Sequence, residues 1–311
     1  MILAVLTAAA ALASAGCGLA DVSGTADQSE IVVTVGPVYD WVKNITEGSD
    51  GVNVRLLAGS GVDMHSFRPS VQDVVVISSA DLFIYIGGES DVWAEDVIES
   101  SGMSAGKTLA LLPELGSRAL DEELREGMQE EEEEGETEEP EKDEHVWLSL
   151  KNAAVLCGSI SDRIASLDPA NADLYRDNAR RYVSELNALD TRYESMIGDS
   201  AKKTLIFGDR FPFLYLVRDY GLEYYAAFSG CSAETEASFE TVVFLADKLK
   251  EFGLDCVIRL ETSDGKLART VIDTAEKTDA QVLVMDSMQS GETDYMKAME
   301  KNLDVLREAL K

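Results

Sequence analysis

Short apolar runs alternate along the chain with longer stretches in which apolar residues recur at helical spacing. In the first half, the runs that predict strands are Ile31–Val35, Val52–Leu57, Leu82–Ile86 and Thr108–Leu112, and helices are expected near Val38–Thr46, Pro69–Ser79 and Asp91–Glu99. In the second half, strands are expected at Thr204–Phe207, Tyr224–Phe228, Cys256–Leu260 and Val282–Met285, and helices near Phe213–Tyr220, Phe239–Phe252 and Lys266–Lys277. Because strands that alternate with helices form parallel sheets, the pattern predicts two α/β lobes, each with a mostly parallel four-stranded sheet.

The stretch between the two halves predicts one long helix. Residues 170–196 contain neither Gly nor Pro, while Pro169 suits a first helical turn and Gly198 suits a helix end. About 28 residues at about 1.5 Å per residue make a rigid rod of about 42 Å, long enough to cross a whole lobe. The predicted organisation is an N-terminal lobe at 31–167, a connecting helix at 168–198 and a C-terminal lobe at 199–311.

The first 17 residues resemble a secretory leader. Ile2–Gly16 is apolar but shorter than the roughly 20 residues that span a bilayer, and it ends in small residues followed by Cys17. This end is similar to the bacterial lipobox, although Ser14 replaces the usual Leu and no Lys or Arg precedes the apolar run. We expect a signal peptide at 1–17, lipidation of Cys17 and a small, polar tether at 18–30. The alternative is a plain secretory signal with an incidental cysteine.

The chain is strongly acidic, with 27 Lys and Arg against 58 Asp and Glu and a formal charge of −31. This charge repels nucleic acid and anionic lipid, so neither is an expected partner, and membrane contact is expected through the lipid anchor only. An acidic insertion at about 129–144 contains the low-complexity run Glu130–Glu144. Because like charges repel, the run is expected to be disordered, either as a weak collector of cations or as a solvated insertion.

Both histidines of the chain occupy informative places. His65 lies in a loop between a predicted strand and a predicted helix, and His145 lies just before another helical stretch. Neutral imidazole is the commonest protein ligand for zinc. Two histidines far apart in the sequence are weak evidence for a metal site by themselves, so the interpretation depends on the residues around them.

Those surrounding residues resemble the metal-binding lipoproteins of ABC importers for zinc and manganese, a family of solute-binding proteins with a rigid helical backbone. The segment G-V-D-M-H-S-F-R-P-S around His65 is similar to the family's G-x-D-P-H-x-Y-x-P-[ST], with Met64 for Pro and Phe67 for Tyr. The segment D-E-H-V-W-L-S-L-K-N around His145 is similar to D-x-H-x-W-x-[DS]-x-x-N. The resemblance covers essentially the whole mature chain, and it implies that each segment supplies one histidine ligand.

The resemblance also implies ligands from the second half. Asp286 follows the apolar run Val282–Met285, as the family's aspartate ligand does, and a carboxylate at a strand's carboxyl end faces the ligand cleft. At the family's third position, which holds His or Glu, this chain has Arg210, and arginine cannot coordinate a cation. Either Arg210 pairs with Asp286, or Asp209 takes its place, or another group completes the shell.

Cys231 is a candidate for that other group, because it follows the predicted strand Tyr224–Phe228 and so should border the cleft. A nearby guanidinium would lower the pKa of its thiol, and a thiolate ligand favours zinc over manganese. The alternatives are an inert cysteine or a disulfide with Cys256. Glu261, at the end of another predicted strand, is expected to orient a ligand or to form an ion pair with Arg210.

The expected function is binding and delivery without chemical conversion. We expect an extracytoplasmic, lipid-anchored monomer that captures Zn²⁺ between its lobes at His65, His145 and Asp286 and delivers it to the permease and ATPase of an ABC importer. Manganese or iron binding within the same family is the first alternative, and a zinc-dependent hydrolase is another. The sequence contains no H-E-x-x-H, G-x-S-x-G, Walker A or G-x-G-x-x-G motif that would support an enzyme.

Overall fold

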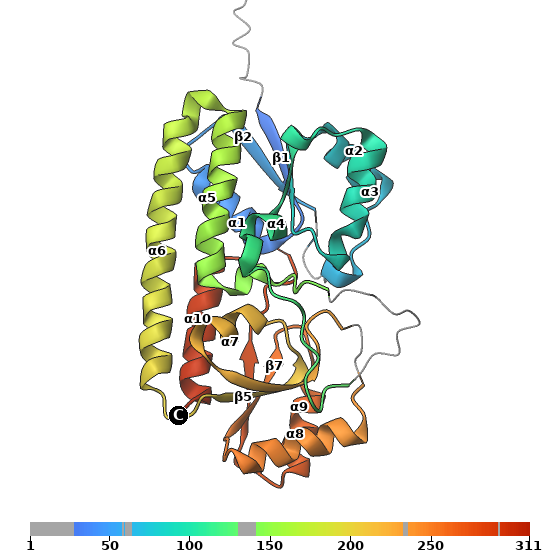
Figure 1. Ribbon diagram of the computed structural model, residues 1–311, viewed down its shortest axis with the longest axis vertical. Coiled ribbons are helices and arrows are strands. Elements are labelled where there is room, and N and C mark those ends of the chain that lie inside the picture. Colours follow the sequence, from blue (N-terminus) through green and yellow to red (C-terminus); the bar gives the residue numbers. More distant parts are fainter. Residues whose placement is uncertain (1–27, 58, 60–63, 130–140, 233–235, 292) are drawn as a thin grey trace, which may run out of the picture.

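The computed structural model describes residues 28–57, 59, 64–129, 141–232, 236–291 and 293–311. These residues form two α/β lobes, one above the other in Figure 1. The predicted signal peptide, Cys17 and most of the predicted acidic insertion lie outside the described residues. Within the described part, none of the helices is both long and apolar enough to cross a membrane.

The N-terminal lobe is built on a parallel sheet of four strands in the order β2-β1-β3-β4. The strands are β1 (Ser29–Val33), β2 (Val52–Leu56), β3 (Leu82–Tyr85) and β4 (Thr108–Ala110), and the helices are α1 (Gly36–Ile45), α2 (Val71–Ser79), α3 (Val92–Ser101), α4 (Leu111–Leu115) and α5 (Leu150–Leu167). Alternate residues of a strand face opposite sides of the sheet. Accordingly Val32 packs with Ile77 of α2, whereas Ile31 packs in the core that includes Trp41 of α1.

The C-terminal lobe repeats this plan, with strand order β6-β5-β7-β8, all parallel. Its strands are β5 (Thr204–Arg210), β6 (Glu223–Phe228), β7 (Cys256–Leu260) and β8 (Gln281–Met285), and its helices are α7 (Leu214–Tyr220), α8 (Phe239–Glu251), α9 (Lys266–Thr274) and α10 (Tyr295–Ala309). Helices α8 and α9 bury Leu245 and Val271 against one face of the sheet. The predicted fold of two parallel four-stranded sheets is confirmed.

One long helix, α6 (Ala172–Asp199), runs alongside the N-terminal lobe and the adjoining part of the C-terminal lobe (Figure 1). Its 28 residues bury a stripe at helical spacing, made of Tyr175, Ala179, Tyr182, Leu186, Leu189, Tyr193 and Ile197. At one end the Tyr175 hydroxyl is 2.8 Å from Ser49 Oγ of the N-terminal lobe, and at the other the Tyr193 hydroxyl donates to Met299 O of α10 at 2.6 Å. The predicted connecting helix is therefore present and is fixed to both lobes.

Residues 119–129, inside the range predicted for the N-terminal lobe, lie against the C-terminal lobe. Leu120 N donates to the Tyr215 hydroxyl at 3.1 Å, and Gln129 N donates to Ala227 O at 2.8 Å. The chain thus crosses between the lobes here as well as along α6, so the two lobes share a segment as well as a helix.

The expectation that the whole run to Glu144 is disordered is wrong at its end. Asp143 and Glu144 are buried, with 1% and 0% exposure, although they continue an acidic stretch. Their carboxylates accept hydrogen bonds from backbone N–H groups, of His145 for Asp143 and of Ser90 for Glu144, which offset part of the cost of burying them. Local composition cannot show which residues at the end of an acidic run are packed.

Candidate metal centre

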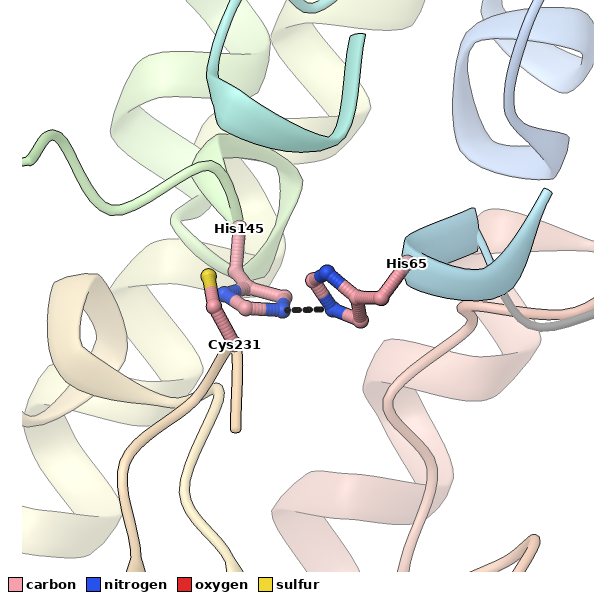
Figure 2. Close-up of side chains that lie close together, drawn as sticks. All are labelled: His65, His145 and Cys231. Carbon is pink, nitrogen blue, oxygen red and sulfur yellow. Dashed lines mark hydrogen bonds between the residues drawn. The ribbon is translucent and has the colours of Figure 1, made fainter. Parts of the chain in front are cut away.

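Three side chains that suit a transition metal meet between the lobes: His65, His145 and Cys231 (Figure 2). Each offers one ligand atom, and these atoms all lie within 4.8 Å of one another. The two histidines come from the N-terminal lobe, and Cys231 follows β6 of the C-terminal lobe. The two lobes therefore jointly form a nitrogen and sulfur site, which suits zinc and copper better than hard cations.

His65 is held by the segment that enters α2 and by the turn after β3. It lies in a 3₁₀ turn, Met64–Ser66, and the following helix is fixed by a capping box between Ser70 and Asp73. Its Nδ1 lies 2.7 Å from the Ser90 hydroxyl oxygen. This contact orients the ring so that its other nitrogen, Nε2, faces the site.

His145 is fully buried and is oriented by the residue two places before it. Its Nδ1 lies 3.1 Å from Asp143 Oδ1, which also accepts a hydrogen bond from the backbone N–H of His145 at 2.8 Å. A carboxylate can only accept, so Nδ1 carries the proton and Nε2 keeps a lone pair. An imidazole whose second nitrogen donates to a carboxylate is the usual arrangement of a metal-binding histidine.

The two Nε2 atoms face each other at 3.2 Å (Figure 2). Two nitrogen ligands of a tetrahedral zinc ion, each at about 2.0–2.1 Å, lie about 3.3 Å apart. The imidazoles already have the spacing that one ion requires.

The residue before Cys231 is Gly230, and its lack of a side chain lets this loop lie close to the His145 ring. A Cβ at Gly230 would lie 2.9 Å from Phe211 O and 3.1 Å from His145 Cε1, so a larger residue would push the ring. The backbone N–H of Cys231 donates to Glu122 Oε1 at 3.0 Å, which fixes the loop to residues 119–129.

The expectation that a guanidinium lowers the pKa of the Cys231 thiol is wrong. Burial raises this pKa well above its usual value, and the carboxylates of Glu122, Glu144 and Asp143 raise it further. Arg210 instead donates from Nη1 to Ser232 O at 3.4 Å. A bound cation would reverse this effect, because a coordinating thiol is deprotonated by the metal itself. No disulfide to Cys256 forms, since both thiols are free.

The remaining predicted site residues make local contacts. Asp286 Oδ1 accepts from Met288 N at 3.0 Å, and Asp286 is not in the group formed by the histidines and Cys231. Glu261 accepts from Ser287 N at 2.8 Å and from Ser287 Oγ at 2.9 Å. Asp209 Oδ2 accepts from Leu260 N at 2.9 Å, so it holds β5 to the end of β7.

Two residues at the site carried no signal in the sequence. Gln289, 3% exposed, places its amide Nε2 2.6 Å from His145 Nε2 and 3.0 Å from His65 Nε2. Glu144 accepts from Ser90 N at 2.6 Å, and its other oxygen lies 4.0 Å from His65 Nδ1. Burial raises the pKa of Glu144 to about 7. Neither an isolated glutamine in a turn nor the end of a long acidic run predicts such a position.

Two parallel-sheet lobes joined by a long helix, with imidazole and thiol groups converging between them, define a two-lobe binding protein for a transition metal. Comparison with known proteins identifies the family within this class. Residues 31–309 match the model of a family described as the periplasmic component A of zinc-uptake complexes, ZnuA, and the chain belongs to this family.

Two relatives and one solved structure illustrate the relationship. The chain is 30% identical over 315 residues to the high-affinity zinc uptake system protein ZnuA of Bacillus subtilis, covering 97% of this chain and 95% of that one. It is 30% identical over 283 residues to the zinc-binding lipoprotein AdcA of Streptococcus pneumoniae serotype 4, covering 89% of this chain. The chain spans about half, 55%, of the length of the streptococcal relatives that it matches. The crystal structure of the Zn(II)-bound ZnuA-like domain of S. pneumoniae AdcA is similar with a TM-score of 0.71 and 26% identity, covering 91% of this chain and 99% of that one.

Proposed function

We propose that this chain is the extracytoplasmic zinc-binding component of an ABC importer. The observation that carries the proposal is the pair of imidazole Nε2 atoms, 3.2 Å apart and each oriented through its Nδ1. The names of the relatives, zinc uptake protein and zinc-binding lipoprotein, agree with this role.

In the proposed mechanism, the chain binds the ion and does not change it chemically. His65 and His145 supply two nitrogen ligands, and Cys231 supplies sulfur in place of the family's third histidine or glutamate. An oxygen from the turn after β8 completes four-coordination, and Asp286 is the residue that the sequence nominates for it. An ion that bridges both lobes stabilises the arrangement in which all four ligands meet.

Delivery of the ion depends on the same stabilisation of the metal-bound arrangement of the two lobes. The loaded form docks on a membrane permease whose ATPase supplies the energy, while the lipid on Cys17 keeps the protein at the outer face of the cell membrane. A sulfur ligand favours zinc over manganese or iron. Manganese or iron is the alternative cargo if a group other than Cys231 supplies the third ligand.

The experiment combines metal analysis with titration of the purified mature chain. We expect one zinc ion per chain after loading, and a zinc dissociation constant at least about 100-fold weaker, or about 2.7 kcal/mol, in His145→Ala. Melting curves of the metal-free proteins check that the variant still folds. Absence of bound zinc in the wild type, or an unchanged affinity in His145→Ala, rejects the proposal.

A further inference from the structure

The side chain of Gln289 lies where the two imidazoles converge, in the turn that follows β8 of the C-terminal lobe. It is 3% exposed, and its terminal amide contacts the Nε2 atoms of both His65 and His145. We propose that Gln289 is the fourth ligand of the ion, through its amide oxygen Oε1, after a half-turn of the amide group. This inference rests on the proposed function, because it names one ligand of the same site.

The hydrogen bonds define which end of the amide now faces the histidines. Because Asp143 accepts the proton on His145 Nδ1, His145 Nε2 can only accept. Gln289 therefore presents its N–H group, at 2.6 Å from His145 Nε2. Its oxygen lies on the opposite side, 3.0 Å from Ser287 Oγ. The amide N–H therefore lies in the direction of the lone pair of His145 Nε2, which is the direction in which this nitrogen would bind a metal ion.

The terminal amide nitrogen of Gln289 lies as far from the two histidine Nε2 atoms as one metal ligand lies from another. The three nitrogens form a triangle with sides of 3.2, 3.0 and 2.6 Å. The corners of such a triangle lie about 1.7 Å from its centre, so an ion about 1.1 Å above the plane is about 2.0–2.1 Å from all three, which is the Zn–N and Zn–O distance. After the half-turn, the corner now occupied by the amide nitrogen holds the amide oxygen.

The neighbours of Gln289 accommodate either orientation. The Ser287 hydroxyl lies 3.0 Å from Gln289 Oε1 and 2.9 Å from Glu261 Oε1. With the amide reversed, Gln289 Nε2–H donates to Ser287 Oγ, and the hydroxyl proton is donated to Glu261. A hydroxyl can both donate and accept, so the half-turn leaves no buried polar group without a partner.

Asp286 fits a supporting role better than the fourth position. Its Oδ1 accepts from Met288 N, and its backbone is held by Asn302, whose amide contacts both Asp286 N and Asp286 O at 2.8 Å. These bonds shape the turn that carries Gln289. The amide oxygen is neutral, so it binds the ion less strongly than a carboxylate at the same place would.

The test compares Zn²⁺ dissociation constants of the mature chain and three variants, measured by competition with a chromophoric chelator. Gln289→Leu replaces the amide by an apolar side chain without an oxygen, and it should weaken binding by about tenfold to a hundredfold. Gln289→Glu keeps an oxygen and should bind at least as tightly as the wild type. Asp286→Asn should weaken binding less than Gln289→Leu does. The visible spectrum of bound Co²⁺ should change in Gln289→Leu, because it reports the number and type of ligands.

Three outcomes overturn the inference. An unchanged affinity in Gln289→Leu excludes Gln289 as a ligand, and a tighter one shows that the amide only competes with the ion. An equal loss in Gln289→Leu and Gln289→Glu shows a structural role in the turn. His145→Ala in the same assay separates the two proposals: if that variant loses zinc while Gln289→Leu does not, only the assignment of Gln289 fails.

Discussion

Replacing Cys231 by serine should change how strongly the protein prefers zinc to manganese. Serine keeps the shape of the side chain at this position, so the backbone bond from Cys231 N to Glu122 is retained. In the proposed site, the substitution removes the thiol that would supply the one anionic ligand among His65, His145 and Cys231. We therefore expect an effect on the bound ion and little effect on the fold.

The magnitude follows from the surroundings of the thiol. Because burial and three nearby carboxylates raise the pKa of Cys231, the ion must displace a proton before it gains the thiolate. Part of the gain is offset by that step, so we expect Cys231→Ser to weaken zinc binding by about 100-fold, or about 2.7 kcal/mol. Manganese gains little from sulfur and should weaken by less than about tenfold. The ratio of the two affinities should then fall by at least about tenfold.

Competition titrations with Zn²⁺ and Mn²⁺ on the purified mature chain measure both constants. The matched control is Cys256→Ser, which changes a free, buried thiol at the start of β7. That variant should keep both affinities within about twofold of the wild type. If Cys231→Ser binds zinc as tightly as the Cys256→Ser control, sulfur is not a ligand and the reasoning fails.

Three further results are expected. Ligand imidazoles must lose their protons, so zinc should bind at least about tenfold more weakly at pH 5 than at pH 7.5, and equal affinity would refute histidine ligation. Asp143→Asn removes the carboxylate that orients His145, so titration should show a loss of about tenfold to a hundredfold in zinc affinity. Burial raises the pKa of Asp40 to about 6, so the folded state loses stability as the pH rises from about 4 to 6. Asp40→Asn avoids this loss, so urea unfolding should show a free energy of unfolding about 1–2 kcal/mol higher than that of the wild type at pH 7.5, a figure discounted for the partial exposure of Asp40. The difference should be smaller at pH 4.5.

Much of the fold was predictable because buried parallel strands are short, apolar and separated by helices. Cys256–Leu260 is a strand with the predicted bounds, and Val52–Leu56 differs by one residue. Helix α10 was not predicted, although Tyr295, Met299 and Leu303 recur at helical spacing and are buried. The charged residues between them lower the mean hydropathy of the segment and hide this apolar stripe.

The candidate site was predictable only where a local segment carries it. His65 and His145 lie in segments of recognisable spacing, and both imidazoles reach the same point. Gln289 is 144 residues from His145, and no local pattern marks a glutamine in a turn as a neighbour of an imidazole. The predicted direction of the pKa shift at Cys231 was also wrong, because this shift depends first on burial of the thiol and then on the approach of Glu122 and Glu144, which are properties of the tertiary fold.

The turn after β8 belongs to the C-terminal lobe by sequence but is fastened to the segment that carries His145. The Trp147 indole N–H donates to Ser287 O at 2.9 Å, and the Tyr295 hydroxyl donates to Trp147 O at 2.6 Å, both in the interior. His145 and Gln289 are therefore parts of one buried unit that spans the lobe boundary. Ligands that are already held in place lose little entropy when an ion binds. Cys231, whose loop is held by Glu122, lies outside this unit, so in the proposed site the choice among metals would depend most on how closely its sulfur approaches the two imidazoles.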